Sequence, residues 1–224
     1  QEAVIWHSLR HPNIVTLWGI ARTEMGQPML VVDRLEMTLD ERLRLSPVPT
    51  QEERTQWLLN IAYAFKYLHS RNPPVIHRDL KPDNVLLDGK GKACISDFGM
   101  SRFHANYSYA ASRDPTRGAY LFSPPESHQR GYIATPKYDV YSWAMTAYEV
   151  LTRHRPFIGE ESANEPQTVI NWIINRQRPY RTGAQCHDPP ADTISDGLWN
   201  LIEKCWAQNP SIRPGFDEIV NTLE

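Results

Sequence analysis

The sequence predicts an α+β protein with a small strand-rich part near its start and a mostly helical remainder. Two short apolar runs, 14–19 and 29–32, are flanked by turn residues and have the composition of strands. Two further runs, 85–87 and 93–96, surround an Asp-Gly turn and predict a hairpin. Much of the remaining chain shows apolar residues at helical spacing, which makes helices the dominant element.

The helices are predicted by capping residues and by apolar periodicity. Thr50 and Glu53 have the spacing of a capping box and open a helix to about Ser70. Thr135 and Pro136 start another helix, because proline is favoured in the first turn, and its apolar residues fall on one face. Further helices are predicted at 1–9, 169–174, 198–206 and 216–223.

Composition limits the classes of function. The chain has 224 residues, 41% of them hydrophobic, which is enough for one sizeable core or two small lobes. A formal net charge of −2 gives no electrostatic reason to expect a nucleic acid or an anionic membrane as partner. No apolar run approaches membrane length, so no membrane insertion is expected. The widely spaced Cys94, Cys186 and Cys205 indicate reduced thiols in a cytoplasmic protein rather than disulfides or a zinc site.

The residues with the clearest chemistry lie on both sides of the predicted hairpin. Asp79, Lys81 and Asn84 place a carboxylate, an ammonium and a carboxamide within six residues, and Asp97 follows the hairpin. Because a hairpin returns the chain to its starting end, we expect Asn84 and Asp97 to lie together. An amide oxygen and a carboxylate oxygen are ligands expected for Mg²⁺ that holds a polyphosphate. The competing interpretation is a polar turn without function, since these residue types are common in turns.

Two motifs in this region resemble those of a known family. Protein kinases carry a catalytic loop H-R-D-x-x-x-x-N and a D-F-G motif, and the sequence matches both in order and spacing. The matching residues are His77-Arg78-Asp79-Leu80-Lys81-Pro82-Asp83-Asn84 and Asp97-Phe98-Gly99. The C-terminal part of the sequence resembles that of the tyrosine-kinase-like group, which includes receptor-interacting and mixed-lineage kinases. The residues that carry this resemblance are Cys205-Trp206, Asn209-Pro210 and Arg213-Pro214.

This resemblance implies a protein-kinase-like fold with a truncated N-lobe. The implied divisions of a kinase domain over 1–224 are a partial N-lobe at 1–32, a hinge at 33–36 and a mostly helical C-lobe at 37–224. No G-x-G-x-x-G motif occurs, and no lysine precedes Glu2. Because the first residue is Gln1 rather than Met, we expect the missing family elements upstream, and little kinase activity from residues 1–224 alone.

The resemblance also implies roles for four residues of the two motifs. Asp79 is expected to orient the acceptor hydroxyl and take its proton, and Lys81 to contact the transferring phosphate. Asp97 is expected to bind Mg²⁺ that bridges the phosphates of ATP, with Asn84 on a second metal ion. Lys81 followed by Pro82 resembles serine/threonine kinases more than tyrosine kinases.

Nucleotide binding is assigned by the resemblance to residues outside these motifs. The backbone at Asp33 and Leu35 is expected to meet the adenine, and Leu86 is a further expected nucleotide-binding residue. A strand-to-helix connector without function is the alternative for the first two. Glu2 is expected to hold the lysine that grips the α- and β-phosphates, and its alternative is a solvated helix residue.

The implied activity is that of a serine/threonine protein kinase in signalling, with ATP and a protein as substrates. Pairing with a second copy or a related kinase is a further expectation for this group. Ala119 stands where the family carries a threonine whose hydroxyl bonds the catalytic aspartate and lysine. The alternative function is therefore a catalytically weak or inactive kinase homologue that acts as a scaffold or an allosteric module.

Three structural expectations complete the comparison with kinases. Residues 100–120 stand in the place of the activation loop, where Arg78 could bind a phosphate added to a hydroxyl. Glu126 and Arg213 are expected to form a buried ion pair. Asp139 is expected to anchor the catalytic-loop backbone, the alternative being a carboxylate that only favours the helix dipole.

Overall fold

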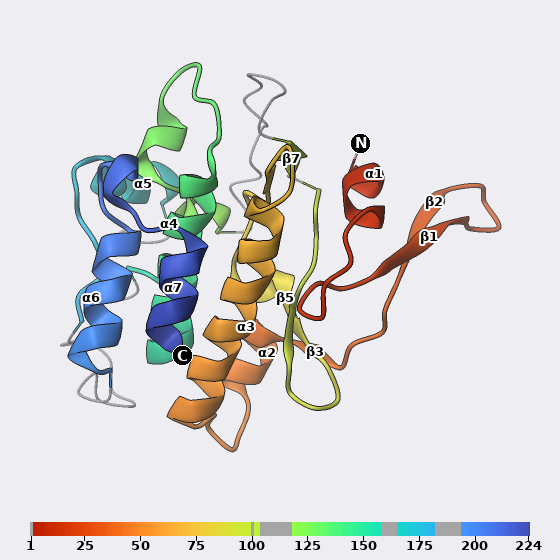
Figure 1. The fold of residues 1–224 in the computed structure, drawn as a ribbon, viewed down its shortest axis with the longest axis horizontal. Helices are drawn as coiled ribbons and strands as arrows, with labels where there is room; N and C mark the ends of the chain where they lie inside the picture. The colour runs from red at the N-terminus through yellow and green to blue at the C-terminus, as the bar shows by residue number, and fades with distance from the viewer. Residues whose placement is uncertain (1, 100, 104–117, 158–164, 182–193) are drawn as a thin grey trace.

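The computed structural model describes residues 2–99, 101–103, 118–157, 165–181 and 194–224, with backbone only at residues 2, 3, 102 and 103. Its elements fall into two regions (Figure 1). Helix α1 (Glu2–His7) and the hairpin of β1 (Leu17–Arg22) and β2 (Pro28–Val32) lie on one side. The larger region on the other side is mainly helical, in agreement with the predicted α+β class.

The N-terminal hairpin differs from its predicted boundaries. The first strand was expected to span 14–19, but β1 begins at Leu17 and pairs antiparallel with β2. Ile14 instead forms a parallel bridge with Ile95, and the Val15 N–H donates to the Ile95 carbonyl at 3.0 Å. Residues 14 and 15 therefore join the first region to a strand of the second.

The predicted hairpin at 85–96 is confirmed. Strands β5 (Val85–Leu87) and β6 (Ala93–Ile95) pair antiparallel, and β3 (Met37–Thr38) adds to the free edge of β5. The Asp88 N–H donates to the Lys92 carbonyl at 3.1 Å and closes the turn. Gly91 in this turn has φ +77°, a conformation that favours glycine.

Capping boxes start two helices. Helix α3 (Gln51–His69) begins where Thr50 and Glu53 predicted it, with the Glu53 N–H donating to Thr50 Oγ1 at 3.1 Å. Helix α2 (Leu39–Arg44) was not predicted, although Thr38 and Glu41 form the same box. The T-x-x-E pattern would have indicated this second helix.

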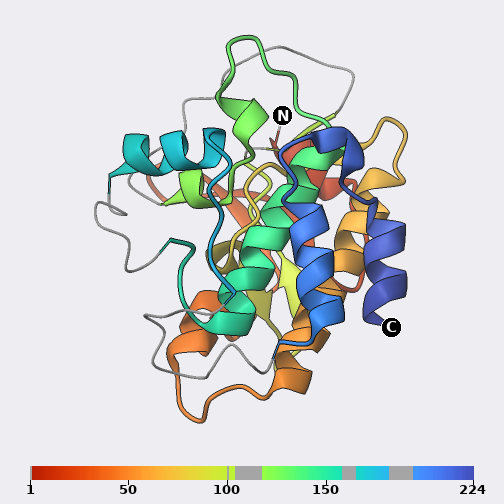
Figure 2. The same ribbon diagram turned by 90° about the vertical axis from the view of Figure 1, so that its left-hand side faces the viewer.

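Helix α4 (Pro136–Thr152) forms the centre of the helical region (Figures 1 and 2). Its residues from Tyr138 to Thr152 are all buried, as the resemblance to kinases implies for a helix that runs through the core. Helix α3 contacts it on one side and α6 (Asp196–Cys205) on another. Neighbours on several sides remove water from the whole helix, and the polar residues among its positions must find partners inside the protein.

The remaining elements surround this centre. Helices α5 (Pro166–Ile174), α6 and α7 (Phe216–Leu223) match the predicted helices to within three residues. Strand β4 (Val75–Ile76) pairs with β7 (Arg102–Phe103), which lies in a stretch expected to be loop. The short helices are η1 (Pro82–Asn84), η3 (Ala119–Phe122), η4 (Pro125–His128) and η6 (Pro210–Ile212).

Two observations bear on the expectations from composition. Cys94 and Cys205 are free and buried, whereas Cys186 lies outside the described residues. Across the described ranges, no helix combines the length and the apolar character needed to cross a membrane.

Candidate active site

The catalytic-loop residues predicted from the sequence lie together in the structure. The loop follows β4, ends in η1 and leads into β5. The Lys81 ammonium lies 3.3 and 3.5 Å from the two Asp79 carboxylate oxygens. Asn84 Nδ2 donates to Asp79 Oδ2 at 2.8 Å and to the Asp79 carbonyl at 2.7 Å. A carboxylate is thus held between an ammonium and an amide by contacts within six residues.

Burial strengthens the contacts of this carboxylate. The Lys81 side chain is 7% exposed and the Asp79 side chain is 17% exposed. Charges attract more strongly where little water screens them, so this ion pair is stronger than a surface pair at the same distance. Asn84 uses its Nδ2 group toward Asp79, which leaves its Oδ1 oxygen available to another partner.

Asp97 lies at the same end of the hairpin as Asn84. The Ser96 N–H and Oγ donate to the Asn84 carbonyl at 2.9 and 3.0 Å, which places the neighbouring Asp97 beside the loop. Asp97 is exposed, and its Oδ1 accepts a hydrogen bond from the Gly99 N–H at 3.2 Å. Its φ of +58° is unusual for a residue with a side chain and costs on the order of 1 kcal/mol.

The donor set fits a magnesium ion that also binds phosphate. Within the described ranges, no group of three or more His, Cys, Asp or Glu side chains is arranged to hold a metal. Asn84 and Asp97 offer one amide oxygen and one carboxylate. Mg²⁺ commonly takes one or two protein oxygens and completes its shell with phosphate oxygens and water. The two residues therefore suit a metal that arrives with a polyphosphate.

Asp139 anchors the loop backbone, as expected. It lies in the first turn of α4 and has no solvent exposure. Its Oδ2 accepts from the His77 N–H at 3.0 Å and its Oδ1 from the Arg78 N–H at 2.9 Å. His69 Nε2 lies 2.9 Å from Oδ2, a partner that the sequence reasoning missed. Arg78 has φ +72°, and these bonds hold the loop in that strained conformation.

Aromatic rings join helix α1 to the loop. The Phe98 ring lies 5.3 Å from the ring of Trp6 and 4.9 Å from that of His77. The His77 ring is also fixed by Nε2, 2.9 Å from the Ser96 carbonyl oxygen. Sequence reasoning gave Trp6 no role, and the available signal was a large aromatic residue on a predicted helix.

The predicted nucleotide-binding residues make contacts within the protein that do not by themselves indicate a nucleotide site. The Asp33 carboxylate accepts from the Thr16 N–H at 2.9 Å and from Trp18 Nε1 at 2.7 Å. Burial by itself would raise the pKa of Asp33. The hydrogen bonds from Thr16 and Trp18 outweigh this effect and hold the pKa of Asp33 below its usual range. This side chain therefore braces β1, and its backbone carbonyl remains the group that could meet a ligand.

Leu35 precedes β3, and Leu86 lies in β5, the central strand of the β3–β5–β6 sheet. Both are partly buried against the core. The Glu36 N–H donates to the Leu87 carbonyl at 3.0 Å, and Thr38 pairs with Leu86. The backbone of Glu2 begins α1, but its side chain lies outside what the structure describes, so its expected ion pair is not placed.

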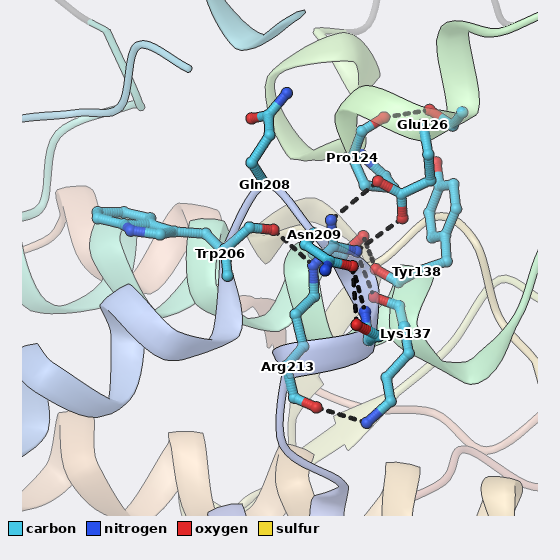
Figure 3. A network of polar contacts seen from close by, with 12 residues as sticks. Pro124, Glu126, Lys137, Tyr138, Trp206, Gln208, Asn209 and Arg213 are labelled. Atoms are coloured by element: carbon cyan, nitrogen blue, oxygen red, sulfur yellow. Dashed lines mark hydrogen bonds and ion pairs between the residues drawn. The ribbon is translucent and has the colours of Figure 1, made fainter.

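A buried ion pair ties the segment after residue 118 to the end of the chain (Figure 3). Arg213 donates to both oxygens of Glu126, at 2.7 and 2.8 Å, and its side chain has no exposure. Its guanidinium also donates to the carbonyls of Ala207 and Lys137, each at 2.9 Å, and lies over the Tyr141 ring at 5.1 Å. The expected buried pair is confirmed.

The expected activation loop is described only at its ends. Residues 104–117, with Tyr107, Ser108, Tyr109, Ser112 and Thr116, lie outside the described residues, as does any phosphate site there. Ser101 is fully buried, and its Oγ donates to the His77 carbonyl at 3.4 Å, so it is not open to modification. Ala119 begins η3 and has no hydroxyl to offer to Asp79 or Lys81.

Comparison with known proteins agrees with this geometry. A model of the protein kinase domain matches residues 1–223. The chain is 32% identical to receptor-interacting serine/threonine-protein kinase 2 of Bos taurus, over all of the chain and 42% of that protein. It is 31% identical to receptor-interacting serine/threonine-protein kinase 4 of Mus musculus, over all of the chain and 28% of that protein.

A third relative is the probable serine/threonine-protein kinase drkD of Dictyostelium discoideum, 35% identical over all of the chain and 16% of that protein. The chain thus spans less than half the length of each of these relatives. The match over nearly every residue, together with the loop and D-F-G geometry, shows that the chain belongs to the protein kinase family and resembles its tyrosine-kinase-like group.

Proposed function

We propose that this chain carries the catalytic loop and substrate-binding lobe of a serine/threonine protein kinase that transfers the γ-phosphate of ATP to protein hydroxyls. The observation that carries the proposal is the set of contacts joining Asp79, Lys81 and Asn84. Asp139 fixes the backbone of the same loop. The serine/threonine names of its relatives favour that acceptor class.

In this proposal each loop residue has one task. Asp79 accepts a hydrogen bond from the acceptor hydroxyl, orients its oxygen and takes its proton as transfer proceeds. Lys81 neutralises charge that develops on the transferring phosphate, and its own contact with Asp79 keeps it in reach. Asn84 positions the Asp79 carboxylate through Nδ2. Positioning and charge neutralisation are the main contributions that phosphoryl transfer requires from the protein.

Asn84 Oδ1 and the Asp97 carboxylate would hold Mg²⁺. When bound, the metal ion supplies positive charge that offsets the negative charge of the phosphates. The adenine would contact the backbone at Asp33 and Leu35 and the side chain of Leu86, and Glu2 would pair with the phosphate-gripping lysine. These assignments rest on the match to family positions, and the partial burial of Leu35 and Leu86 against the core is consistent with them.

The proposed divisions and setting follow from the same match. Residues 1–32 would form part of an N-lobe, 33–36 the hinge and 37–224 the C-lobe. The separate β1–β2 and β3–β5–β6 sheets support that division. The cytoplasm is the proposed location, and a protein substrate, ATP and a second kinase molecule are the proposed partners.

A second candidate function is that of a weakly active or inactive homologue that works as a scaffold or allosteric module. The observation that favours it is Ala119, whose methyl group cannot bond the Asp79–Lys81 pair. If Ala119 limits catalysis, then Ala119→Thr should raise phosphate transfer several-fold by supplying that hydroxyl. If this substitution leaves an already high rate unchanged, then Ala119 is not a limiting feature.

The deciding assay is transfer of radiolabelled phosphate from Mg·ATP to the protein itself and to a generic basic protein. The 224-residue chain and its natural full-length gene product should be assayed in parallel with Asp79→Asn. We expect transfer in the full-length protein and a loss of at least about a hundredfold in the variant, because the base contributes roughly that factor. Absence of both transfer and ATP binding would support the scaffold function instead.

A further inference from the structure

A pocket lies where the C-terminal half of α3, the first two turns of α4 and the start of α7 meet. Helix α3 contacts both other helices (Figure 1). The pocket has a volume of about 600 Å³, which is within the range of sites that hold small molecules. We call it the α3–α7 pocket. Asp79, Lys81 and Asn84 are not among the described residues that line it, so it is distinct from the candidate active site.

Ring side chains form much of the wall of this pocket. They are His11, Tyr63, Tyr67, His69 and Phe216. The His11 and Tyr67 rings stack with their centroids 5.1 Å apart, and the Phe216 ring makes a T-shaped contact with His69 at 5.2 Å. Aromatic rings favour both kinds of contact, so a planar aromatic ligand could add to either. The wall therefore suits a ligand with a flat aromatic body.

The charged side chains that line the pocket are not balanced. Lys66 is paired with Asp217, since its Nζ lies 3.0 Å from Asp217 Oδ1. Lys137 pairs with no carboxylate of the described residues; its Nζ donates to the Arg213 carbonyl (Figure 3) and to the Pro214 carbonyl. Because an ammonium has three N–H donors, one remains for a ligand. A carboxylate is a group that would take this donor and balance the charge of Lys137.

Other charges near the pocket leave this balance unchanged. The Arg71 guanidinium lies 5.6 Å from the centroid of the Tyr67 ring, and the Tyr63 hydroxyl donates to the Glu224 carboxylate. These two charges are of opposite sign and offset each other. Burial lowers the pKa of His11, and the charge of Lys92 lowers it further, so this ring adds no positive charge at neutral pH.

His69 connects the pocket to the catalytic loop. Its ring lines the pocket, and its Nε2 lies 2.9 Å from Asp139 Oδ2. The same carboxylate accepts hydrogen bonds from the His77 and Arg78 N–H groups. A ligand that packs against the His69 ring would restrict its motion, and so would restrict the carboxylate that holds the loop.

We propose that the α3–α7 pocket binds a small planar aromatic carboxylate, whose ring lies against the aromatic wall and whose carboxylate bonds Lys137. Occupancy of the pocket holds the catalytic loop more firmly through His69 and Asp139. This inference goes beyond the proposed function, because neither the binding nor its effect on the loop requires phosphate transfer.

The binding test compares 2-naphthoate with its uncharged isostere 2-naphthamide by calorimetric titration of the 224-residue chain. We expect naphthoate to bind with a Kd below about 1 mM and at least about tenfold more tightly than the amide. Lys137→Met retains an apolar side chain of similar length but removes the ammonium, so it should abolish the preference for the acid. Lys204→Met, which removes an exposed lysine outside the pocket, is the matched control and should leave both affinities unchanged.

The effect on the loop is measured by hydrogen–deuterium exchange at the backbone amides of His77 and Arg78. Saturating naphthoate should slow their exchange at least about threefold relative to the amides of α6, which report any general stabilisation. His69→Gln retains an amide donor for Asp139 but removes the ring. This variant should still bind naphthoate through Lys137, and its loop should no longer respond to the ligand.

Each part of the inference has an outcome that would overturn it. Equal affinities for the acid and the amide, or equal losses in Lys137→Met and Lys204→Met, would overturn the binding site. Binding that leaves loop exchange unchanged, or slows it equally in His69→Gln, would overturn the connection to the loop. None of these measurements involves phosphate transfer, so their failure would leave the proposed function standing.

A second variant keeps the test decisive if Lys137→Met does not fold. Lys66→Met changes a side chain that is 43% exposed and leaves Asp217 without its partner beside the pocket. The unpaired carboxylate should repel naphthoate and weaken its binding about two- to threefold, with no change for the amide. No loss of naphthoate affinity in this variant would overturn the binding site.

Discussion

Replacing Glu126 with glutamine tests whether the buried ion pair holds the two ends of the helical region together. Arg213 has a fully buried side chain, and two of its four guanidinium hydrogen bonds go to Glu126. Glutamine keeps one acceptor oxygen and the shape of the side chain, but it leaves a buried cation without its counter-ion. Breaking a buried pair in this way costs about 3–5 kcal/mol. Because glutamine retains one hydrogen bond to Arg213, the expected cost is at the lower end, about 3 kcal/mol.

The measurement is the free energy of unfolding in urea at neutral pH, with thermal unfolding as a second readout. A loss of about 3 kcal/mol should lower the melting temperature of a chain of this size by roughly 6–12 °C. The matched control is Asp217→Asn, which breaks the exposed Lys66–Asp217 pair at 3.0 Å, where the side chains are 43% and 80% exposed. That pair should contribute less than about 1 kcal/mol, because water screens it.

The reasoning would be refuted if Glu126→Gln destabilised the protein no more than Asp217→Asn. Such a result would mean that the cost of removing the Glu126 charge from water offsets its attraction to Arg213, so that this charge adds no net stability.

Three further predictions concern other buried groups. Burial raises the pKa of Glu149 to about 7, so the folded state binds this proton more tightly than the unfolded chain does. The free energy of unfolding, measured in urea titrations, should therefore fall by roughly 2–3 kcal/mol as the pH rises from 5 to 8. Glu149→Gln should flatten this pH dependence. Asp139→Asn removes one hydrogen-bond acceptor of the catalytic-loop backbone. In an active kinase, kcat should then fall by at least about tenfold while KM for ATP changes little, and a change confined to KM would contradict this prediction. Burial raises the pKa of Cys94 to about 11 and also raises the pKa of Cys205, so mass spectrometry should find both thiols unmodified by iodoacetamide until urea unfolds the chain.

Features whose partners lie close in sequence were predictable. The Thr50–Glu53 capping box and the turn at Asp88-Gly89 involve contacts between residues three or four positions apart, and both are present. Helix α7 matches its predicted limits, since its apolar residues repeat at helical spacing. The same reasoning would have identified α2 from Thr38 and Glu41, so that omission was not a limit of the sequence.

Features that depend on distant neighbours did not follow from local pattern; the Glu126–Arg213 pair and the Asp139 anchor were expected only through the resemblance to kinases. The start of β1 shifted because Ile14 and Val15 pair with Ile95, some eighty positions away. The apolar residues of helix α4 indicate one buried face, and neighbours on several sides bury its polar positions as well from Tyr138 onward. The spacing of apolar residues indicates which positions can be buried, but it does not indicate how many neighbouring elements will cover the helix.

The same division applies to the candidate site. The sequence by itself determined which chemical groups are present, because Asp79, Lys81 and Asn84 lie within six residues and contact one another through local geometry. The anchor from Asp139 in helix α4 was expected only through the resemblance to kinases, and only the tertiary structure showed that His69 also contacts this carboxylate. The tertiary structure also decided that Arg155 would lie among carboxylates from three elements. Those contacts join residues tens of positions apart, and the packing of the whole chain is what brings them together.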